Sequence, residues 1–494
     1  MYGRQRVLWV GPGPEPAFAS KFSERGLELL VTTLGQFDSH VAYSRAAVFW
    51  LPSDAELEAL CQRYLAVALS HGLLVFVIVE QQRLSALRLA VDPLPFKKRL
   101  KLTIPANADT IPESSARHDA GPLQSESVAL TGCGGCEGED LLLLQRAFSD
   151  CGEVRLHALE GGGAVVFQAF AKLRDSRCGP YPLPFFVKLD RYTKIERELA
   201  NYRDCTTHFI PFFARPNLSA ARCLLGAIRG IIVGDFVEHS DSLADLVQRG
   251  TAQRAIDSLF QDALRGWRTQ AYYSNAGVRN GALDTAIKSF PERAQIRARR
   301  YSGEARQLGA AHDSEAIGQL LDALPPIEHR RALCHNDLHG ENVRVRSGDA
   351  ILIDFYAVRE GPLMMDPAAL ETSLVLKFRV QDESSWRSVV ADLYQVDNLV
   401  ALPQLRAPTL PFNELWNSVR QVRRFGLAEQ MSDAEYARAV AIQLLRHATR
   451  PRGGVEDRLR RPWLLKLASD LASNLTARYR PVAQRDVDRT ALGR

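Results

Sequence analysis

The sequence predicts an α/β domain followed by a larger α+β part, and three observations predict it. Apolar runs alternate with helical patterns over residues 1–100, the order expected of a small parallel sheet. Residues 107–127 are polar and lack periodicity, which is typical of a flexible connector. Farther on, strand patterns come first and helical periodicity later. The expected domains are residues 1–100, a linker over 101–140, a strand-rich part over 141–238 and a helical part over 239–494.

The composition is that of an ordinary globular protein. Of 494 residues, 46% are hydrophobic and 24% are charged, and the net charge of +5 neither demands nor excludes a nucleic-acid partner. The first residues lack the apolar core of a secretory signal, and the longest apolar run, residues 72–79, is too short to span a membrane. We therefore expect a soluble cytoplasmic protein, with neither a membrane nor a nucleic acid as partner.

The eight cysteines are scattered, unlike those of a secreted disulfide framework. Cys133 and Cys136 form one C-G-G-C, but no second ligand pair follows at the spacing that a zinc site needs. A redox role would need a strand–helix context, whereas this pair lies in a glycine-rich stretch. A connector is the favoured interpretation, with metal binding and redox chemistry as alternatives.

The first domain is expected to hold a parallel sheet. ELEALCQRYLAVAL (56–69) predicts an amphipathic helix after Ser53 and Asp54, which suit an N-cap. The apolar segments that predict buried strands are RVLWV (6–10), LELLVTT (27–33), AAVFWL (46–51) and LLVFVIV (73–79).

This domain has three candidate roles. GPGPEP (11–16) follows the first strand, as a dinucleotide-binding turn would, but Pro16 stands at the third glycine position. The strand order resembles that of receiver domains, which need a phosphoacceptor Asp at the tip of the third strand. That strand ends AVFWLP, without an Asp, so the usual phosphorylation is expected to be absent. An interaction or scaffold domain with a protein partner is favoured.

The strand-rich part places a lysine in an apolar strand. FFVKLD (185–190) carries Lys188, which is costly to bury unless it is paired or bound to phosphate. The next predicted helix, KIERELANY (194–202), offers Glu196 and Glu198 as partners. Glu198 is favoured because it lies on the packed side of the helix, and Glu196 remains open. The other predicted elements are a helix over 141–150 and strands over 154–159, 165–173 and 227–237.

Glycines form a turn between two of these strands. LEGGGAVVF (159–167) contains Gly161, Gly162 and Gly163, a flexible turn that departs from the G-x-G-x-x-G with which protein kinases cover phosphates.

Farther along, the apolar strand that ends in Asp235 and Val237 runs into an acidic turn that begins a helix. Such a segment suits a connector between two lobes, whose backbone would face an adenine ring.

The chemistry is concentrated in HNDLHGEN (335–342). Transfer of a phosphoryl group from ATP needs a carboxylate that orients the attacking hydroxyl and oxygen ligands that hold Mg²⁺. Protein kinases use H-x-D-x-x-x-x-N, followed by a second acidic metal ligand at a strand end. His335, Asp337 and Asn342 reproduce that spacing, and ILIDFY supplies the later acid, Asp354.

The order of these features resembles that of the aminoglycoside phosphotransferase and choline kinase-like group, over residues 141–480. The features are the glycine turn, Lys188, Glu198, HNDLHGEN, IDFY and GPLMMDPAALE. They also resemble the kinase-like modules called ternary complex associated domains. The resemblance implies a two-lobed protein kinase-like fold and ATP and Mg²⁺ as cofactors. It implies Asp337 as the base, Asn342 and Asp354 as metal ligands, and Lys188 on the phosphates.

Other polar residues near these motifs are expected to have mainly structural roles, with His339 as the exception. His335 is expected to pack the loop, whereas His339 could contact phosphate or substrate, which makes it a second catalytic candidate. Asp366 is expected to cap the helix that follows it. Arginine-rich stretches such as 293–300 and 457–463 are expected to be solvated helix faces.

Two functions follow from this pattern. The first is an ATP-dependent phosphotransferase that acts on a hydroxyl of a small molecule or protein. The second is a nucleotide-binding regulator with little turnover, a pseudo-kinase in a bacterial signalling or conflict assembly, which the additional N-terminal domain favours. A protein or nucleic-acid kinase is a weaker third. Because residues 250–310 are rich in Arg and Lys, we expect that a cationic aminoglycoside is not the acceptor.

Overall fold

The computed structural model divides into two compact units. Unit 1 comprises residues 1–199 and 217–236, and unit 2 comprises residues 200–216 and 237–494. In the part of the chain that is described, no helix is long and apolar enough to cross a membrane. The structure describes residues 5–41, 44–50, 60–92, 94, 99–118, 128–159, 163–174, 181–226, 229–273, 278–281, 292–401, 412–449 and 455–479.

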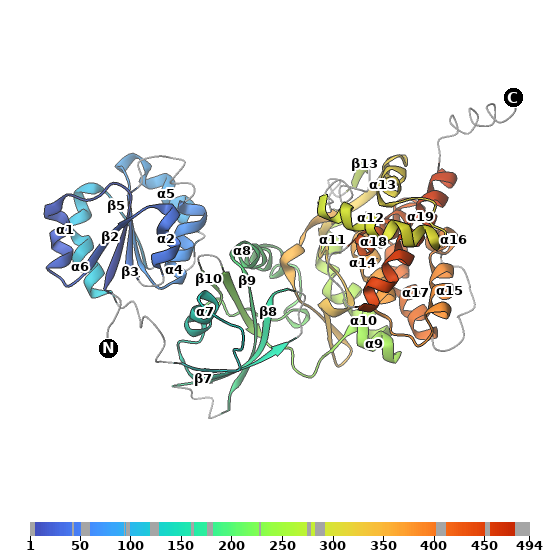
Figure 1. Ribbon diagram of the computed structural model, residues 1–494, viewed down its shortest axis with the longest axis horizontal. Helices are drawn as coiled ribbons and strands as arrows, with labels where there is room; N and C mark the ends of the chain where they lie inside the picture. Colours follow the sequence, from blue (N-terminus) through green and yellow to red (C-terminus); the bar gives the residue numbers. More distant parts are fainter. Residues whose placement is uncertain are drawn as a thin grey trace. The chain divides into compact units, whose positions relative to one another are not determined.

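Unit 1 begins with a parallel five-stranded sheet in the order β2-β1-β3-β4-β5, here called the N-terminal sheet. Helices cover both of its faces (Figure 1), and its strands are therefore nearly continuous apolar runs. The predicted parallel α/β domain is confirmed, whereas its likeness to receivers stays a prediction. The strands are β1 (Arg6–Val10), β2 (Glu28–Thr32), β3 (Ser44–Trp50), β4 (Leu74–Ile78) and β5 (Leu100–Thr103). The helices are α1 (Pro16–Ser23) and α6 (Ile111–Arg117) on one face, and α2 (Leu34–His40), α4 (Leu65–Ser70) and α5 (Leu84–Val91) on the other.

The expected linker over 101–140 contains regular structure. Strand β5 ends at Thr103, and α6 follows with Ile111 fully buried in the same core as Phe22 of α1. The expectation is therefore wrong for residues 101–118, and also where β6 (Ala129–Thr131) and the start of α7 (Glu139–Ala147) fall within the expected linker. A short helix with one large apolar anchor leaves little periodicity in a polar stretch, which explains the error. Residues 119–127 lie outside the described part of the chain.

A six-stranded sheet completes unit 1, in the order β10-β11-β9-β8-β7-β6, here called the central sheet. Its neighbours are antiparallel except for the parallel pair β6–β7. Helix α7 (Glu139–Ala147) packs on one face, and α8 (Tyr192–Asn201) packs Ile195 against Gly230 on the other. The strands are β6 (Ala129–Thr131), β7 (Cys151–Leu159), β8 (Val165–Leu173), β9 (Leu183–Arg191), β10 (Leu224–Leu225) and β11 (Arg229–Asp235).

Unit 2 is mostly helical, with two small sheets in the orders β12-β15-β16 and β13-β14-β17. The strands are β12 (Asp241–Ser242), β13 (Val278–Gly281), β14 (Ile327–Cys334), β15 (Val343–Arg346), β16 (Asp349–Leu352) and β17 (Arg359–Pro362). The helices are α9 (Leu243–Arg249), α10 (Gln253–Ser258), α11 (Arg265–Tyr273), α12 (Glu292–Gln307), α13 (Ser314–Asp322), α14 (Met365–Lys377), α15 (Glu383–Leu393), α16 (Val396–Val400), α17 (Asn413–Leu427), α18 (Glu435–Thr449) and α19 (Val455–Tyr479).

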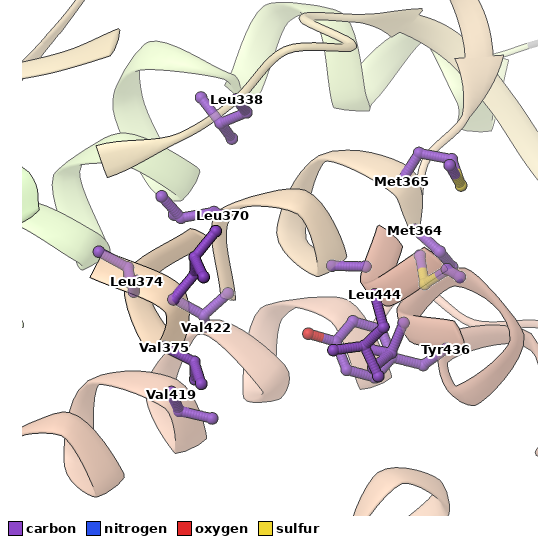
Figure 2. Close-up of a cluster of buried hydrophobic side chains, with 14 of the residues drawn as sticks. Leu338, Met364, Met365, Leu370, Leu374, Val375, Val419, Val422, Tyr436 and Leu444 are labelled. Atoms are coloured by element: carbon purple, nitrogen blue, oxygen red, sulfur yellow. The ribbon is translucent and has the colours of Figure 1, made fainter. Parts of the chain in front are cut away.

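The core of unit 2 is built around α14, which is buried along nearly its whole length. Figure 2 shows Leu370 and Leu374 of this helix in one cluster with Val422 of α17 and Leu444 of α18. Leu338, from the loop HNDLHGEN, belongs to the same cluster. The loop is thus anchored in the hydrophobic core by one of its own side chains.

A buried ion pair crosses this core. Arg423 of α17 donates two hydrogen bonds to Glu371 of α14, at 2.9 and 2.7 Å, and Tyr436 donates a third at 2.7 Å. The side chains of Arg423 and Glu371 are 2% and 0% exposed. Removing one partner would leave an uncompensated charge in the core.

We predict that Arg423→Met lowers the free energy of unfolding by about 3–5 kcal/mol, because it leaves the Glu371 carboxylate without its cation. Urea denaturation at neutral pH measures this change. The matched control is Arg254→Met, since Arg254 pairs with Asp349 at 3.1 Å on the surface. An exposed pair of this kind is worth less than about 1 kcal/mol. Equal losses in the two variants would contradict the prediction.

Glu435 is a second buried acid in unit 2. It lies at the start of α18, is fully buried, and accepts a hydrogen bond from the Met431 N–H at 2.7 Å. Burial raises the pKa of Glu435 to about 7. The folded protein therefore holds this proton more tightly than the unfolded chain does, and the deprotonated form is penalised.

We predict that Glu435 makes the protein less stable as pH rises from about 4.5 to 7, because the unfolded chain releases the proton first. Below this window both states are protonated, and above it the loss is complete at roughly 3 kcal/mol. Urea denaturation across pH 5–8 should show that Glu435→Gln removes this part of the pH dependence. Glu304→Gln, on an exposed position of α12, should leave it in place. Parallel curves for the wild type and Glu435→Gln would refute the assignment.

Candidate active site

Unit 1 contains a buried lysine–glutamate pair. Lys188 lies on β9 opposite Ile232 of β11, on the face of the central sheet that α8 covers. Its Nζ donates to Oε2 of Glu198 at 2.8 Å, and both side chains are nearly buried, at 11% and 8% exposure. Glu196 instead accepts a hydrogen bond from the Tyr192 hydroxyl at 2.8 Å. The structure therefore selects Glu198 over Glu196 as the partner of the lysine.

The other candidates in the strand-rich part lie at turns and at the unit boundary. Gly163 has φ +137° in the turn between β7 and β8, a conformation that favours glycine. Gly161 and Gly162 lie outside the described residues. Asp235 is exposed at the end of β11 and accepts a hydrogen bond from Asn217 at 3.0 Å. The chain passes from unit 1 to unit 2 between Phe236 and Val237, inside the expected connector.

Unit 2 contains the loop HNDLHGEN, whose first residues bind a buried carboxylate. Asp366, at the start of α14, accepts the backbone N–H groups of His335 and Asn336 at 2.7 and 2.9 Å. It is only 5% exposed, and burial raises its pKa, an effect that His335 opposes. Two backbone amides that would otherwise be buried without acceptors are thereby satisfied.

Asn336 bends the chain at this point. Its φ of +58° is uncommon outside glycine, and Asn tolerates it better than most residues. Its side-chain amide donates to the carbonyls of Cys334 and Arg359, each at 3.0 Å. His335 is fully buried, and its Nε2 lies 3.0 Å from the Ile353 carbonyl. The expected packing role of His335 matches this position.

The bend leaves Asp337 and His339 partly exposed while Leu338 between them is buried. Their side chains are 35% and 27% exposed, and Nε2 of His339 lies 4.0 Å from Oδ2 of Asp337. Gly340 lies so close to α9 and α14 that a Cβ there would come within 2.9 Å of Ala244. The alternation of exposed polar and buried small or apolar residues directs the two candidate catalytic side chains toward solvent.

The two candidate metal ligands meet through a hairpin. Strands β15 and β16 pair Val343 with Leu352, and the Ile353 N–H donates to the Asn342 carbonyl at 3.0 Å. Asp354 follows directly, with φ +64° and ψ +74°, and is partly exposed. The Asn342 side chain donates to the Asp337 carbonyl at 3.0 Å. The hairpin therefore joins Asp337, Asn342 and Asp354 into one local arrangement.

The backbone after Asp354 is also bound. The Asn201 amide donates to the carbonyls of Phe355 and Tyr356 at 2.9 and 3.0 Å, and the ring of Tyr202 lies 6.0 Å from that of Phe355. The candidate metal ligands, Asn342 and Asp354, offer oxygen atoms, which suit Mg²⁺. Within the described residues, no group of three or more His, Cys, Asp and Glu side chains could hold a metal ion. A site with an amide and one carboxylate leaves coordination positions for phosphate oxygens and water.

The sequence pattern does not reveal two residues that shape the loop. Asp366 was expected to cap its helix, but its carboxylate binds the loop 31 and 30 residues earlier in the chain. Asn336 was not singled out, although it holds the bend. A signal for Asp366 did exist, since an acid amid the apolar residues of MMDPAAL has to find a buried partner.

Comparisons with known proteins bear on residues 278–407, which match the model of a family described as the phosphotransferase enzyme family, APH. No curated protein matches the chain. For these residues the predicted resemblance to the aminoglycoside phosphotransferase and choline kinase-like group is confirmed, whereas its extent over residues 141–480 and its subgroup stay predictions.

Similar solved structures include three kinases. An amicoumacin kinase in complex with AMP-PNP, Ca²⁺ and Ami is 16% identical, with a TM-score of 0.34, covering 65% of this chain and 88% of its own. A glucosamine kinase in complex with glucosamine, ADP and inorganic phosphate is 15% identical, with a TM-score of 0.34, covering 67% and 96%. A choline kinase from Cryptosporidium parvum is 10% identical, with a TM-score of 0.29, covering 69% and 91%.

We predict that Asp366→Ala releases the loop, because two buried N–H groups lose their acceptor at about 1–3 kcal/mol each. Hydrogen exchange at the amides of His335 and Asn336 should accelerate, and the free energy of unfolding should fall. The matched control is Asp382→Ala, since Asp382 accepts the N–H groups of Ser384 and Ser385 at an exposed helix start. That variant should leave exchange in the loop unchanged. Unaltered loop protection in Asp366→Ala would contradict the role assigned to this carboxylate.

Proposed function

We propose that this chain, a relative of the phosphotransferase enzyme family, transfers the γ-phosphate of ATP to a hydroxyl acceptor in the presence of Mg²⁺. The observation that carries the proposal is the bent loop of unit 2. There Asp337, Asn342 and Asp354 stand in kinase spacing and are joined by the β15–β16 hairpin. A solvated surface loop would need neither the buried carboxylate of Asp366 nor the strained backbone of Asn336.

Each residue of this arrangement has a proposed task. Asp337 accepts the proton of the acceptor hydroxyl and orients its oxygen. Asn342 and Asp354 hold Mg²⁺, which neutralises the phosphate charge when it is bound with the nucleotide. His339 contacts phosphate or substrate beside Asp337. These tasks match a loop whose polar side chains are partly exposed while its backbone is anchored.

Unit 1 has the complementary task of binding the nucleotide. Lys188 contacts the phosphates, and Glu198 holds the ammonium group in place. A buried lysine needs such a partner, and the 2.8 Å pair supplies it. Gly163 lies over the phosphates, and the backbone from Asp235 to Val237 faces the adenine ring.

The acceptor is proposed to be neutral or anionic rather than a polycationic aminoglycoside. A polycation would need clustered carboxylates, whereas residues 250–310 are rich in Arg and Lys. The arginines of residues 250–310 argue less strongly against a cationic acceptor than their number suggests, because some of their charge is neutralised. Several of them, including Arg268 and Arg299, are paired with Glu429 and Glu315.

The regulator with little turnover remains the second candidate. It is favoured by the N-terminal α/β domain, which a dedicated small-molecule kinase does not need. In that case the chain would bind ATP without consuming it, and residues 1–100 would contact a protein partner.

We predict that the purified full chain consumes ATP in a Mg²⁺-dependent manner and that Asp337→Asn lowers the rate by about 10²–10⁴-fold, because the general base is lost. ATP consumption and intact mass, read from the same samples, measure turnover and self-phosphorylation. Asp349→Asn is the control, since Asp349 is an exposed carboxylate on the same hairpin.

Three outcomes decide between the candidates. Turnover that is equal in Asp337→Asn and the wild type would exclude the proposed base. ATP that is bound but unspent in both would favour the regulator. Kanamycin phosphorylation at ordinary rates would overturn the acceptor proposal.

A further inference from the structure

The N-terminal domain packs directly on the lysine–glutamate half of unit 1. Helix α4 contacts β10, the edge strand of the central sheet. The apolar core on this face of the N-terminal sheet, with Leu65 and Leu69 of α4, is continuous with Tyr192 and Ile195 of α8. Both side chains of α8 are nearly inaccessible, at 6% and 0% exposure. Helix α8 thus lies in a core that the N-terminal domain helps to build.

Polar side chains reinforce this contact. The guanidinium of Arg63 lies 5.9 Å from the centre of the Tyr192 ring, within the range of a cation–π contact. Asp38 of α2 holds Arg63 at 2.6 Å. At the other end of α4, Nε2 of His71 lies 3.5 Å from Oε1 of Glu139 at the start of α7. The contact therefore combines an apolar core with polar pairs.

The residues that bind the N-terminal domain share a helix with Glu198. Tyr192, Ile195 and Leu199 follow one another at helical spacing and belong to the same hydrophobic core. Tyr192 also donates its hydroxyl to Glu196 at 2.8 Å, which holds its ring against the helix. Ile195 is pressed against Gly230, where a Cβ would come within 2.8 Å of its side chain. A rotation of α8 would therefore move Glu198 and disturb this packing together.

We infer that the N-terminal domain is a built-in clamp on α8, in which Arg63 and Tyr192 position Glu198 against Lys188. Tyr192 is a positioning residue because it acts through the helix rather than on a substrate. This inference rests on the proposed function only where the Lys188–Glu198 pair is taken to serve nucleotide binding. The packing of the clamp stands without that step.

Sheets of this order usually bind ligands in a crevice at one end. In this domain we do not infer a ligand site there. In a 2-1-3-4-5 sheet that crevice lies beyond the carboxyl ends of β1 and β3. Gly11 there lies so close to Trp50 that a Cβ would come within 1.9 Å of its carbonyl oxygen. Trp9 packs edge-on against Trp50 at 6.1 Å and donates to the Pro12 carbonyl at 2.7 Å. Among the described residues, indole rings and a tight turn lie at this end of the sheet, whereas α4 contacts the central sheet.

The test is hydrogen exchange of α8 in the full chain. Arg63→Glu places a second acid beside Asp38 and removes the cation over Tyr192, and Tyr192→Ala removes the ring. Both variants should accelerate hydrogen exchange of the amides between Ile195 and Leu199 by about tenfold, because the N-terminal domain would no longer pack on that segment. The KM for ATP should rise by a similar factor, with kcat changing less. Tyr192→Phe, which keeps the ring, should stay close to the wild type.

Lys21→Glu is the matched control. Lys21 pairs with Asp109 on the opposite side of the N-terminal sheet, and its side chain is 40% exposed, as is that of Arg63. Exchange in α8 that is the same in Arg63→Glu, Tyr192→Ala and Lys21→Glu would overturn the clamp. Faster exchange in the first two, in a protein that consumes no ATP, would support the clamp while the proposed function fails.

Discussion

One buried carboxylate sets the conformation on which the candidate site depends. Asp366 binds two consecutive backbone amides at the entrance of HNDLHGEN, and its place at the start of α14 ties that entrance to a helix that is buried along nearly its whole length. With the entrance held, the positive φ of Asn336 turns the chain, and Leu338 enters the core. The exposure of Asp337 is thus a consequence of contacts made behind it.

The same principle, a charge buried only with its partners, recurs in both units. Lys188 would be costly in β9 without Glu198, and Glu371 would be costly in α14 without Arg423. The two pairs differ in what surrounds them. The pair of unit 2 lies in the helical core, where Tyr436 completes the carboxylate shell, whereas Lys188 lies on a sheet face beside a helix. The first is suited to stability, and the second to a ligand that could share the lysine.

Elements and contacts that depend on neighbouring residues could be predicted from the sequence, whereas those that depend on distant residues could not. Strand β8 and the pairing of Lys188 with Glu198 follow from apolar runs and helical phase, because these signals lie within a few residues of one another. Strand β5 and helix α6 were hidden in polar sequence, since their burial depends on the N-terminal sheet that they complete. The bond from Asp366 to the loop joins residues about 30 apart, and no periodicity records such a distance.

The two functional candidates can now be separated by argument. A regulator that never transfers phosphate has no need for a loop that holds Asp337 partly exposed beside Asn342, since binding alone would be served by unit 1. Conversely, a simple transferase has no need for a domain whose core continues into α8. The chain has both features, each formed within one unit. A transferase in which the helix that carries Glu198 is held by the N-terminal domain accounts for both, and a partner of that domain would then act on α8 first.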